Sequence, residues 1–303
     1  MRAAAIETTR RLTLLKVTLA VIFWGASFIA TKIALRDIPP VTVVWLRFGL
    51  GVIVLGTAVS VRRELKMPER RDLAYFAFLG FLGITFHQWL QSTGLQTARA
   101  STTSWIVATT PIFIAILGRL LLGERLGWLR SAGIGLAAWG VLLVVTGGDF
   151  RPLFSGHFGS QGDILILISA VNWAVFTTFS RSGLQRHPAA RMMFFVMVAG
   201  WIFTTLLFLP QASWNEIAQL SPEGWASILF LGLFCSGLAY IFWYDALQNI
   251  PASQAGAFLY LEPLVTLVLS ALILLEDVTW VSATGGATIL LGVWLVNRRT
   301  VRE

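Results

Sequence analysis

A carboxylate, an imidazole and a set of aromatic rings are the side chains of this sequence that could do chemistry, and all lie in apolar stretches. Glu262 directly precedes Pro263, where a carboxylate could receive an ammonium group or bind and release a proton. The alternative is a structural carboxylate that pairs with an arginine or holds the chain around the proline. His87, with Gln88 and Gln91, forms a second polar patch. A lone histidine of this kind more often donates to a neighbouring carbonyl than relays protons.

Aromatic residues at helical spacing could complete a pocket for a planar or cationic group. Trp173 and Phe176, like Tyr240 and Tyr244, are spaced to share one helix face. Interfacial anchoring or core packing is the commoner use of such residues. The candidate substrate contacts are Trp24, Ser27, His87, Gln91, Trp105, Thr109, Asn172, Trp173, Phe176, Tyr240, Tyr244, Tyr260 and Glu262. Together they predict an amphipathic small-molecule ligand.

Residues for catalysis or metal binding do not accompany these side chains in any recognisable pattern. The sequence has no HExxH motif and no Cys/His cluster, and Cys235 is its only cysteine. An intramembrane enzyme would need an aligned nucleophile and base, or metal ligands. We therefore expect no metal, no cofactor and no enzymatic activity, with an intramembrane enzyme or a channel as the alternatives from other classes.

The elements that hold these residues are predicted to be membrane-spanning helices. Of the 303 residues 56% are hydrophobic and 13% charged, and the mean hydropathy of +0.74 leaves no polar sequence for a soluble catalytic domain. The uncharged stretches are twice as long as a barrel strand and show no two-residue alternation. Ten segments are predicted: Leu12–Leu35, Pro40–Val61, Leu73–Leu95, Ala98–Leu122, Trp128–Val145, Ile164–Ser180, Ala189–Leu209, Ala226–Leu247, Ala252–Leu275 and Trp280–Val296. The predicted fold class is an all-α integral membrane protein.

Lysine and arginine positions predict the orientation. With the N-terminus in the cytoplasm, 18 of the 23 basic residues fall inside and three, Arg36, Arg99 and Arg151, fall outside, while Lys32 and Arg47 lie within spans. This bias predicts that both termini are cytoplasmic. The net charge of +8 is then a topology signal that also meets anionic lipid headgroups, and no nucleic-acid partner is expected.

An internal repeat relates the two halves of the chain. Adding 152 to positions in the third to fifth segments gives similar residues in the eighth to tenth, and a shift of 149 relates the first segment to the sixth. The matches include Phe78-Leu79-Gly80 with Phe230-Leu231-Gly232, Ala100-Ser101 with Ala252-Ser253, Glu124 with Glu276, Gly133 with Gly285 and Gly140 with Gly292. Five helices per repeat is an odd number, so the halves must insert with opposite topology. We expect a first repeat over residues 1–147, an external linker over 148–162 and a second repeat over 163–303, an architecture suited to alternating access.

Two prolines occupy equivalent positions in the repeat. Pro111 and Pro263 lie near the centres of the fourth and ninth segments, and each frees the carbonyl four residues earlier, at Val107 and Leu259. A carbonyl freed at membrane depth must face a cavity, water or another donor. We expect these two helices to be kinked, to line the path and to bend during gating; ordinary tolerated kinks are the alternative.

Several motifs in order carry a family resemblance. They are Ile22-Phe23-Trp24-Gly25-Ala26-Ser27-Phe28, Pro39-Pro40, Trp45-Leu46-Arg47-Phe48, Thr110-Pro111-Ile112-Phe113, Leu121-Leu122-Gly123-Glu124-Arg125, Glu262-Pro263-Leu264 and Leu274-Leu275-Glu276. With the five-plus-five inverted repeat, this sequence resembles the drug/metabolite transporter superfamily, EamA-type, over nearly its whole length. Within that superfamily it is similar to the YddG group of aromatic amino-acid exporters.

The resemblance implies export of small metabolites by alternating access, with aromatic or other hydrophobic amino acids as the expected substrates. Drugs or nucleotide-like compounds are the alternative substrates. A central phosphate clamp is not expected, because Lys32 and Arg181 fall toward opposite helix ends. The expected location is a bacterial inner membrane, the expected partners are the substrate and membrane lipids, and the expected state is a monomer or weak homo-oligomer.

Overall fold

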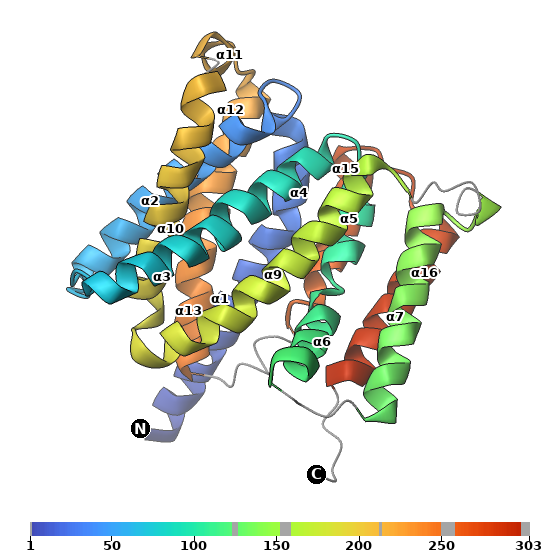
Figure 1. The fold of residues 1–303 in the computed structure, drawn as a ribbon, viewed down its shortest axis with the longest axis horizontal. Coiled ribbons are helices and arrows are strands. Elements are labelled where there is room, and N and C mark those ends of the chain that lie inside the picture. Colours follow the sequence, from blue (N-terminus) through green and yellow to red (C-terminus); the bar gives the residue numbers. More distant parts are fainter. Residues whose placement is uncertain (1, 123–126, 152–158, 212–213, 250–257, 298–303) are drawn as a thin grey trace.

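The computed structural model is a bundle of helices and describes residues 2–122, 127–151, 159–211, 214–249 and 258–297 (Figure 1). The first half of the chain contains α1 (Arg2–Ala34), α2 (Pro40–Val61), α3 (Arg70–Gly80), η1 (Phe81–Phe86), α4 (His87–Leu95), α5 (Ala100–Val107), α6 (Thr110–Leu122) and α7 (Trp128–Thr146). The second half contains α9 (Gln161–Arg186), α10 (Ala189–Phe208), η2 (Leu209–Gln211), α11 (Trp214–Ala218), α12 (Pro222–Leu229), η3 (Phe230–Leu238), α13 (Ala239–Asn249), α15 (Leu261–Ile273) and α16 (Trp280–Asn297).

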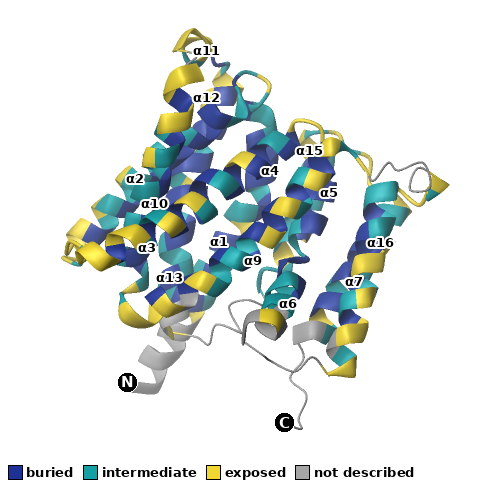
Figure 2. Cartoon of the chain, viewed as in Figure 1, coloured by how far each residue is buried: buried dark blue, intermediate teal, exposed yellow. Residues whose placement is uncertain are grey.

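The predicted membrane spans are present as helices. In the described part of the chain, six stretches are long and apolar enough to cross a membrane: Arg11–Ala34, Pro40–Val61, Arg70–Leu95, Gln161–Arg186, Ala189–Gln211 and Pro222–Ala246. Ser131–Thr146, Leu261–Ile273 and Trp280–Leu295 are shorter apolar helices, and the fourth predicted span is divided between α5 and α6. Figure 2 shows exposed residues along the outer faces of the bundle. Leu120 and Leu272 are more than 70% exposed, as expected for side chains that face lipid tails.

Helix pairing follows the internal repeat. In the first half α1 packs against η3, α13 and α15, and in the second half α9 packs against η1, α4 and α6. Likewise α2 packs against η3, and α10 against η1. The close contacts are equivalent too: Gly51 lies against Ser236, and Gly200 lies against Ile84, positions related by the shifts of 149 and 152. The repeat seen in the sequence is therefore also a repeat of packing.

Two glycine contacts hold α7 and α16 together at one side of the bundle (Figure 1). A Cβ added to Gly140 would lie 2.7 Å from the carbonyl oxygen of Gly285, and one added to Gly292 would lie 2.7 Å from that of Gly133. The two contacts are equivalent under the shift of 152, which relates Gly140 to Gly292 and Gly133 to Gly285. Small residues allow such backbone approach in a membrane, where apolar burial gives helices little reason to associate.

The fourth span is an interrupted helix, and the prediction of a continuous kinked helix was wrong there. There the chain turns at Ala108 and Thr109 between α5 and α6, and the carbonyl of Val107 accepts a 2.7 Å hydrogen bond from the Thr110 hydroxyl. In the ninth span α15 begins only at Leu261, after a turn, and the part over 250–257 lies outside the described residues. In the fourth span the Thr110 hydroxyl thus supplies the hydrogen bond to the Val107 carbonyl that Pro111 cannot donate.

Two π-helical segments were not predicted, and they obey the repeat. Residues 81–86 of η1 match residues 233–238 of η3 under the shift of 152. A π-helical turn contains more residues than an α-helical turn, so it rotates every following side chain about the helix axis. In α4 the first side chain after this rotation is His87.

The predicted boundary of the eighth span was wrong by about one turn. The helix begins at Pro222 and not at Ala226, because Ser221 caps it and accepts a hydrogen bond from the N–H of Gly224. The Asp37 carboxylate accepts hydrogen bonds from the backbone and hydroxyl of Ser221, which ties the end of α1 to this start. The predicted loop before it also contains the short helix α11.

A candidate substrate site between the two halves

His87, Trp173 and Phe176 form one group at the contact between α4 and α9. The His87 ring lies 4.7 Å from the Trp173 ring, and the Trp173 ring lies 4.8 Å from the Phe176 ring, between centroids. His87 Nδ1 is 3.1 Å from the carbonyl oxygen of Ser169, the structural partner expected for a lone histidine. Gly83 of η1 leaves room for Phe176, because a Cβ there would lie 2.6 Å from its ring.

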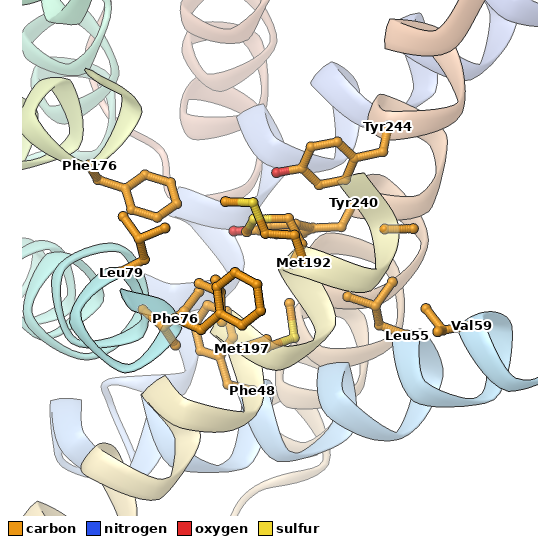
Figure 3. Packing of buried hydrophobic residues seen from close by; sticks show 14 of the residues in the cluster. Phe48, Leu55, Val59, Phe76, Leu79, Phe176, Met192, Met197, Tyr240 and Tyr244 are labelled. Atoms are coloured by element: carbon orange, nitrogen blue, oxygen red, sulfur yellow. The ribbon is translucent and has the colours of Figure 1, made fainter. Parts of the chain in front are cut away.

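Trp24, Tyr240 and Tyr244 form a second group between α1 and α13. The Trp24 ring lies 5.8 Å from the Tyr240 ring, and the two tyrosine rings are 6.3 Å apart. Trp24 Nε1 donates a 3.1 Å hydrogen bond to the carbonyl of Cys235 in η3. Figure 3 shows both tyrosines extending from α13 toward the side where Phe176 lies. Both groups belong to one cluster, so the structure brings together the aromatic residues predicted from the first, sixth and eighth spans.

Small polar residues of the predicted site are used within the fold. The Ser27 hydroxyl donates to the carbonyl of Trp24 at 2.7 Å, and the Asn172 amide donates to the carbonyl of Leu82 in η1 at 2.8 Å. The Thr109 hydroxyl donates to Ile106 at the break in the fourth span. Gln91 is buried, and no described residue hydrogen-bonds to its side-chain amide. Gln91 is therefore, with the side-chain oxygen of Asn172, a polar group that the described residues leave available for a ligand.

Trp105 and Tyr260 lie in a different cluster from the two aromatic groups. Trp105 is 2% exposed and packs against Gly286 of α16, where an added Cβ would lie 2.4 Å from the indole. Tyr260 packs against the same cluster, with Phe28 and Ile166. The predicted site is therefore divided, and Trp105 packs mainly as a support for the broken fourth span.

Glu262 lies in the first turn of α15 and not in the middle of a continuous helix. Its carbonyl would lie 2.8 Å from a Cβ at Gly25, and Thr266 donates to the carbonyls of both Gly25 and Glu262. Glu262 is partly exposed, and no described residue forms an ion pair or hydrogen bond with its carboxylate. The N-terminal end of a helix favours a negative charge, which offsets part of the cost of burying this carboxylate.

Arg47 belongs to the polar centre but was not predicted as a site residue. Its Nε donates to the Ser236 hydroxyl and its Nη1 to the Gln88 side-chain oxygen, each at 3.2 Å. The guanidinium lies 5.0 Å from the centroid of the Phe48 ring, and the residue is 3% exposed. The signal that would have found it was an arginine inside an apolar span, which is a functional candidate by default.

Glu276 joins the two halves at one end of the bundle through hydrogen bonds and an ion pair. Its carboxylate accepts hydrogen bonds from the N–H groups of Ala100 and Ser101 at the start of α5 and from the Ser101 hydroxyl, and it lies 3.7 Å from Lys32 Nζ. Burial opposes ionisation, but the three hydrogen bonds and the Lys32 charge together hold the pKa of Glu276 below its ordinary value. The carboxylate is therefore ionised at neutral pH. Arg99 adds a 2.7 Å bond to the carbonyl of Asp277.

These features define a class: a multi-pass membrane protein with a polar and aromatic centre between two repeated halves has the architecture of a membrane transporter. The family model for EamA-like transporters matches residues 11–146 and again residues 160–298. The chain belongs to the EamA-like transporter family of the drug/metabolite transporter superfamily. Two inverted repeats, alternating access and a small-molecule substrate are general for this family.

Known relatives cover most of the chain. An uncharacterized transporter of Archaeoglobus fulgidus is 29% identical, covering 93% of this chain and 97% of its own. A protein of Streptantibioticus cattleyicolor described as a "probable terminal-alkyne amino-acid exporter" is 30% identical, covering 93% and 92%. A solved crystal structure has a TM-score of 0.66 at 20% identity and covers 93% of this chain and 95% of its own, which shows a shared fold.

Proposed function

We propose that the protein exports small amphipathic metabolites, with aromatic or other hydrophobic amino acids as its substrates. The observation that carries this proposal is the convergence of Trp24, Trp173, Phe176, Tyr240 and Tyr244 from three spans of the two halves. Aromatic rings at this position favour a planar apolar side chain. The relative described as an amino-acid exporter supports the same substrate class.

In this proposal the carboxylate of Glu262, which has no ion-pair partner among the described residues, receives the substrate ammonium, and Gln91 offers a further polar contact. Pro111, just after the break in the fourth span, and Pro263, in the first turn of α15, mark the helices that move between states, because a proline leaves one helical hydrogen bond unmade and makes a change of angle easier there. Drugs are the alternative substrates. Nucleotide-like compounds fit less well, since Lys32 is engaged at the Glu276 end and not at the centre.

Counterflow in proteoliposomes tests the function. Vesicles loaded with unlabelled phenylalanine should accumulate external labelled phenylalanine faster than vesicles without protein, because a carrier exchanges substrate across its two states. Cells that express the protein should also release phenylalanine faster and resist toxic analogues. Saturable exchange identifies a carrier, whereas flux without saturation or exchange identifies a channel. If no amino acid is exchanged, the substrate proposal fails and drug efflux becomes the next test.

We also propose that both termini lie in the cytoplasm of a bacterial inner membrane and that the Glu276 end faces outward. Cysteines substituted at Arg99 and Asp277 test both the orientation and whether this end of the bundle opens during transport. The two residues are close, with Arg99 Nη2 2.7 Å from the carbonyl of Asp277, and the native Cys235 is buried. A membrane-impermeant thiol reagent should label both sites in intact cells. A short reducible bifunctional thiol reagent should abolish exchange, and reduction should restore it. Labelling only in inside-out vesicles would reverse the orientation, and full exchange after complete cross-linking would show that this end does not open.

A further inference from the structure

Arg47 carries a positive charge well inside the membrane without a described counter-ion. It lies seven residues after the start of α2, about 10 Å along the helix axis. Its side chain does not reach for the interface but bonds to η3 and α4, through Ser236 and Gln88. No carboxylate of the described residues lies within ion-pair distance of it, although Lys16, Lys32, Arg62, Arg99 and Arg186 each have one.

Cross-linking of helices does not by itself explain a charge at this position. Both acceptors are neutral, and both bonds are 3.2 Å long, at the long end of the usual range. A neutral amide or hydroxyl could join the same helices. A buried charge without a partner is costly, so its retention here calls for an anion that is present for part of the transport cycle.

The two hydrogen-bond acceptors of the guanidinium are sequence neighbours of residues that contact the two aromatic groups. Ser236 follows Cys235, whose carbonyl accepts the Trp24 indole N–H. Gln88 follows His87, whose ring lies 4.7 Å from Trp173. Phe48, under the guanidinium, belongs to the same cluster as Phe176 and Tyr240. An anionic group on Arg47 would therefore lie beside the Phe48 ring, at the edge of the cluster that contains the candidate aromatic residues.

We propose that Arg47 binds the carboxylate of the transported substrate and makes the carrier selective for carboxylates over the corresponding amines and alcohols. The proposal rests on the proposed function, because it assigns one residue to one group of an amino acid. A guanidinium matches a carboxylate in geometry, with parallel N–H donors to the two oxygens.

Competition against labelled phenylalanine in wild-type counterflow is the first test. Phenylalanine and 3-phenylpropionate carry the carboxylate, whereas phenylalaninol replaces it by an alcohol and phenethylamine lacks it. The two carboxylates should compete, and phenylalaninol should compete about 10- to 100-fold less well than phenylalanine, the range expected for a charge-assisted contact. This comparison needs no variant, so its failure would overturn the proposal even where a substitution at Arg47 prevents folding.

Arg47→Gln is the second test, because glutamine removes the charge and keeps a donor. Apparent affinity for phenylalanine should fall about 10- to 100-fold while competition by phenylalaninol stays unchanged, and Arg47→Lys should restore part of the preference. The control Arg151→Gln removes the same charge from an exposed pair with Asp149. It should change neither the affinity for phenylalanine nor the preference over phenylalaninol. A purely structural arginine would lower the yield or thermal stability of the Gln variant and leave the preference intact.

The outcomes separate this inference from the function on which it rests. Absence of amino-acid exchange in the wild type overturns the proposed function and this inference with it. Exchange of phenylalanine with equal competition by phenylalaninol, or a folded Gln variant that keeps the carboxylate preference, overturns only the role of Arg47.

Discussion

Gly140→Leu should abolish the folded protein or lower its thermal unfolding midpoint sharply, while Gly135→Leu in the same helix should have little effect. At Gly140 an added Cβ would lie 2.7 Å from the carbonyl oxygen of Gly285 and 2.8 Å from the backbone nitrogen of Ile289, and backbone atoms cannot rotate aside. At Gly135 nothing lies within 4 Å. Overpacking typically costs about 1–3 kcal/mol and occasionally more, and the backbone contact places this case at the upper end.

Size-exclusion profiles and thermal unfolding in detergent would measure this difference between the two leucine variants. Gly292→Leu should behave like Gly140→Leu, because Gly292 makes the equivalent contact with Ala137 and Gly133. Equal stability of the Gly140 and Gly135 variants would show that α7 and α16 are not held by this glycine contact. A difference between the Gly140 and Gly292 variants would show that the two contacts of the repeat are not energetically equivalent.

The sequence predicted the spans and the equivalence of the two halves well, because both depend on patterns that extend over many residues. Apolar length identified the segments, and the shift of 152 indicated the equivalence that Gly133, Gly140, Gly285 and Gly292 express in the packing. The predicted repeat and linker boundaries at 147 and 163 stay predictions, since residues 152–158 lie outside the described part of the chain.

Local backbone choices were harder to predict than the spans. The fourth span breaks at Ala108 and Thr109 because the Thr110 hydroxyl offers Val107 an alternative to a helical N–H, and proline alone does not distinguish a break from a kink. At the π-helical segment η1, Gly80 and Gly83 pack closely against α10 and Phe176, which hydrophobic periodicity does not reveal.

The candidate site was predicted in part. Residue type and helical spacing selected Trp173, Phe176, Tyr240 and Tyr244, whose rings do converge. The same criterion also selected Trp105, which packs against Gly286 in another cluster, because spacing along one helix does not say which neighbour that face meets. Arg47 was left out because its partners lie 41 and 189 residues away in the sequence.

Glu262→Gln should lower the apparent affinity for phenylalanine about 10- to 100-fold in counterflow without a pH gradient, and the variant should fold normally. Normal folding is expected because the helix contacts at this position use backbone and threonine groups: Thr266 bonds to the carbonyls of Gly25 and Glu262. The carboxylate itself has no described partner to lose. Glu223→Gln, at an exposed site in α12, is the control for removal of a negative charge.

The measurement separates three roles of this carboxylate. Loss of acceleration by a pH gradient with affinity intact would assign Glu262 to proton coupling and contradict the substrate contact. Reduced yield or thermal stability would assign it to support of α15. If the variant folds well, keeps its affinity for phenylalanine and still responds fully to a pH gradient, Glu262 has no role in the mechanism.

Analogues of phenylalanine make the assignment of both charged residues reciprocal. If Glu262 receives the ammonium and Arg47 the carboxylate, Glu262→Gln should weaken phenylalaninol but not 3-phenylpropionate, and Arg47→Gln should weaken 3-phenylpropionate but not phenylalaninol. Each analogue lacks one of the two charged groups. Each substitution should therefore leave unchanged the affinity for the analogue that lacks the group bound by the substituted residue. A loss of both analogues in either variant would show that the substitution disturbs the shared aromatic site and not one ionic contact, because the rings are the only element that both analogues use.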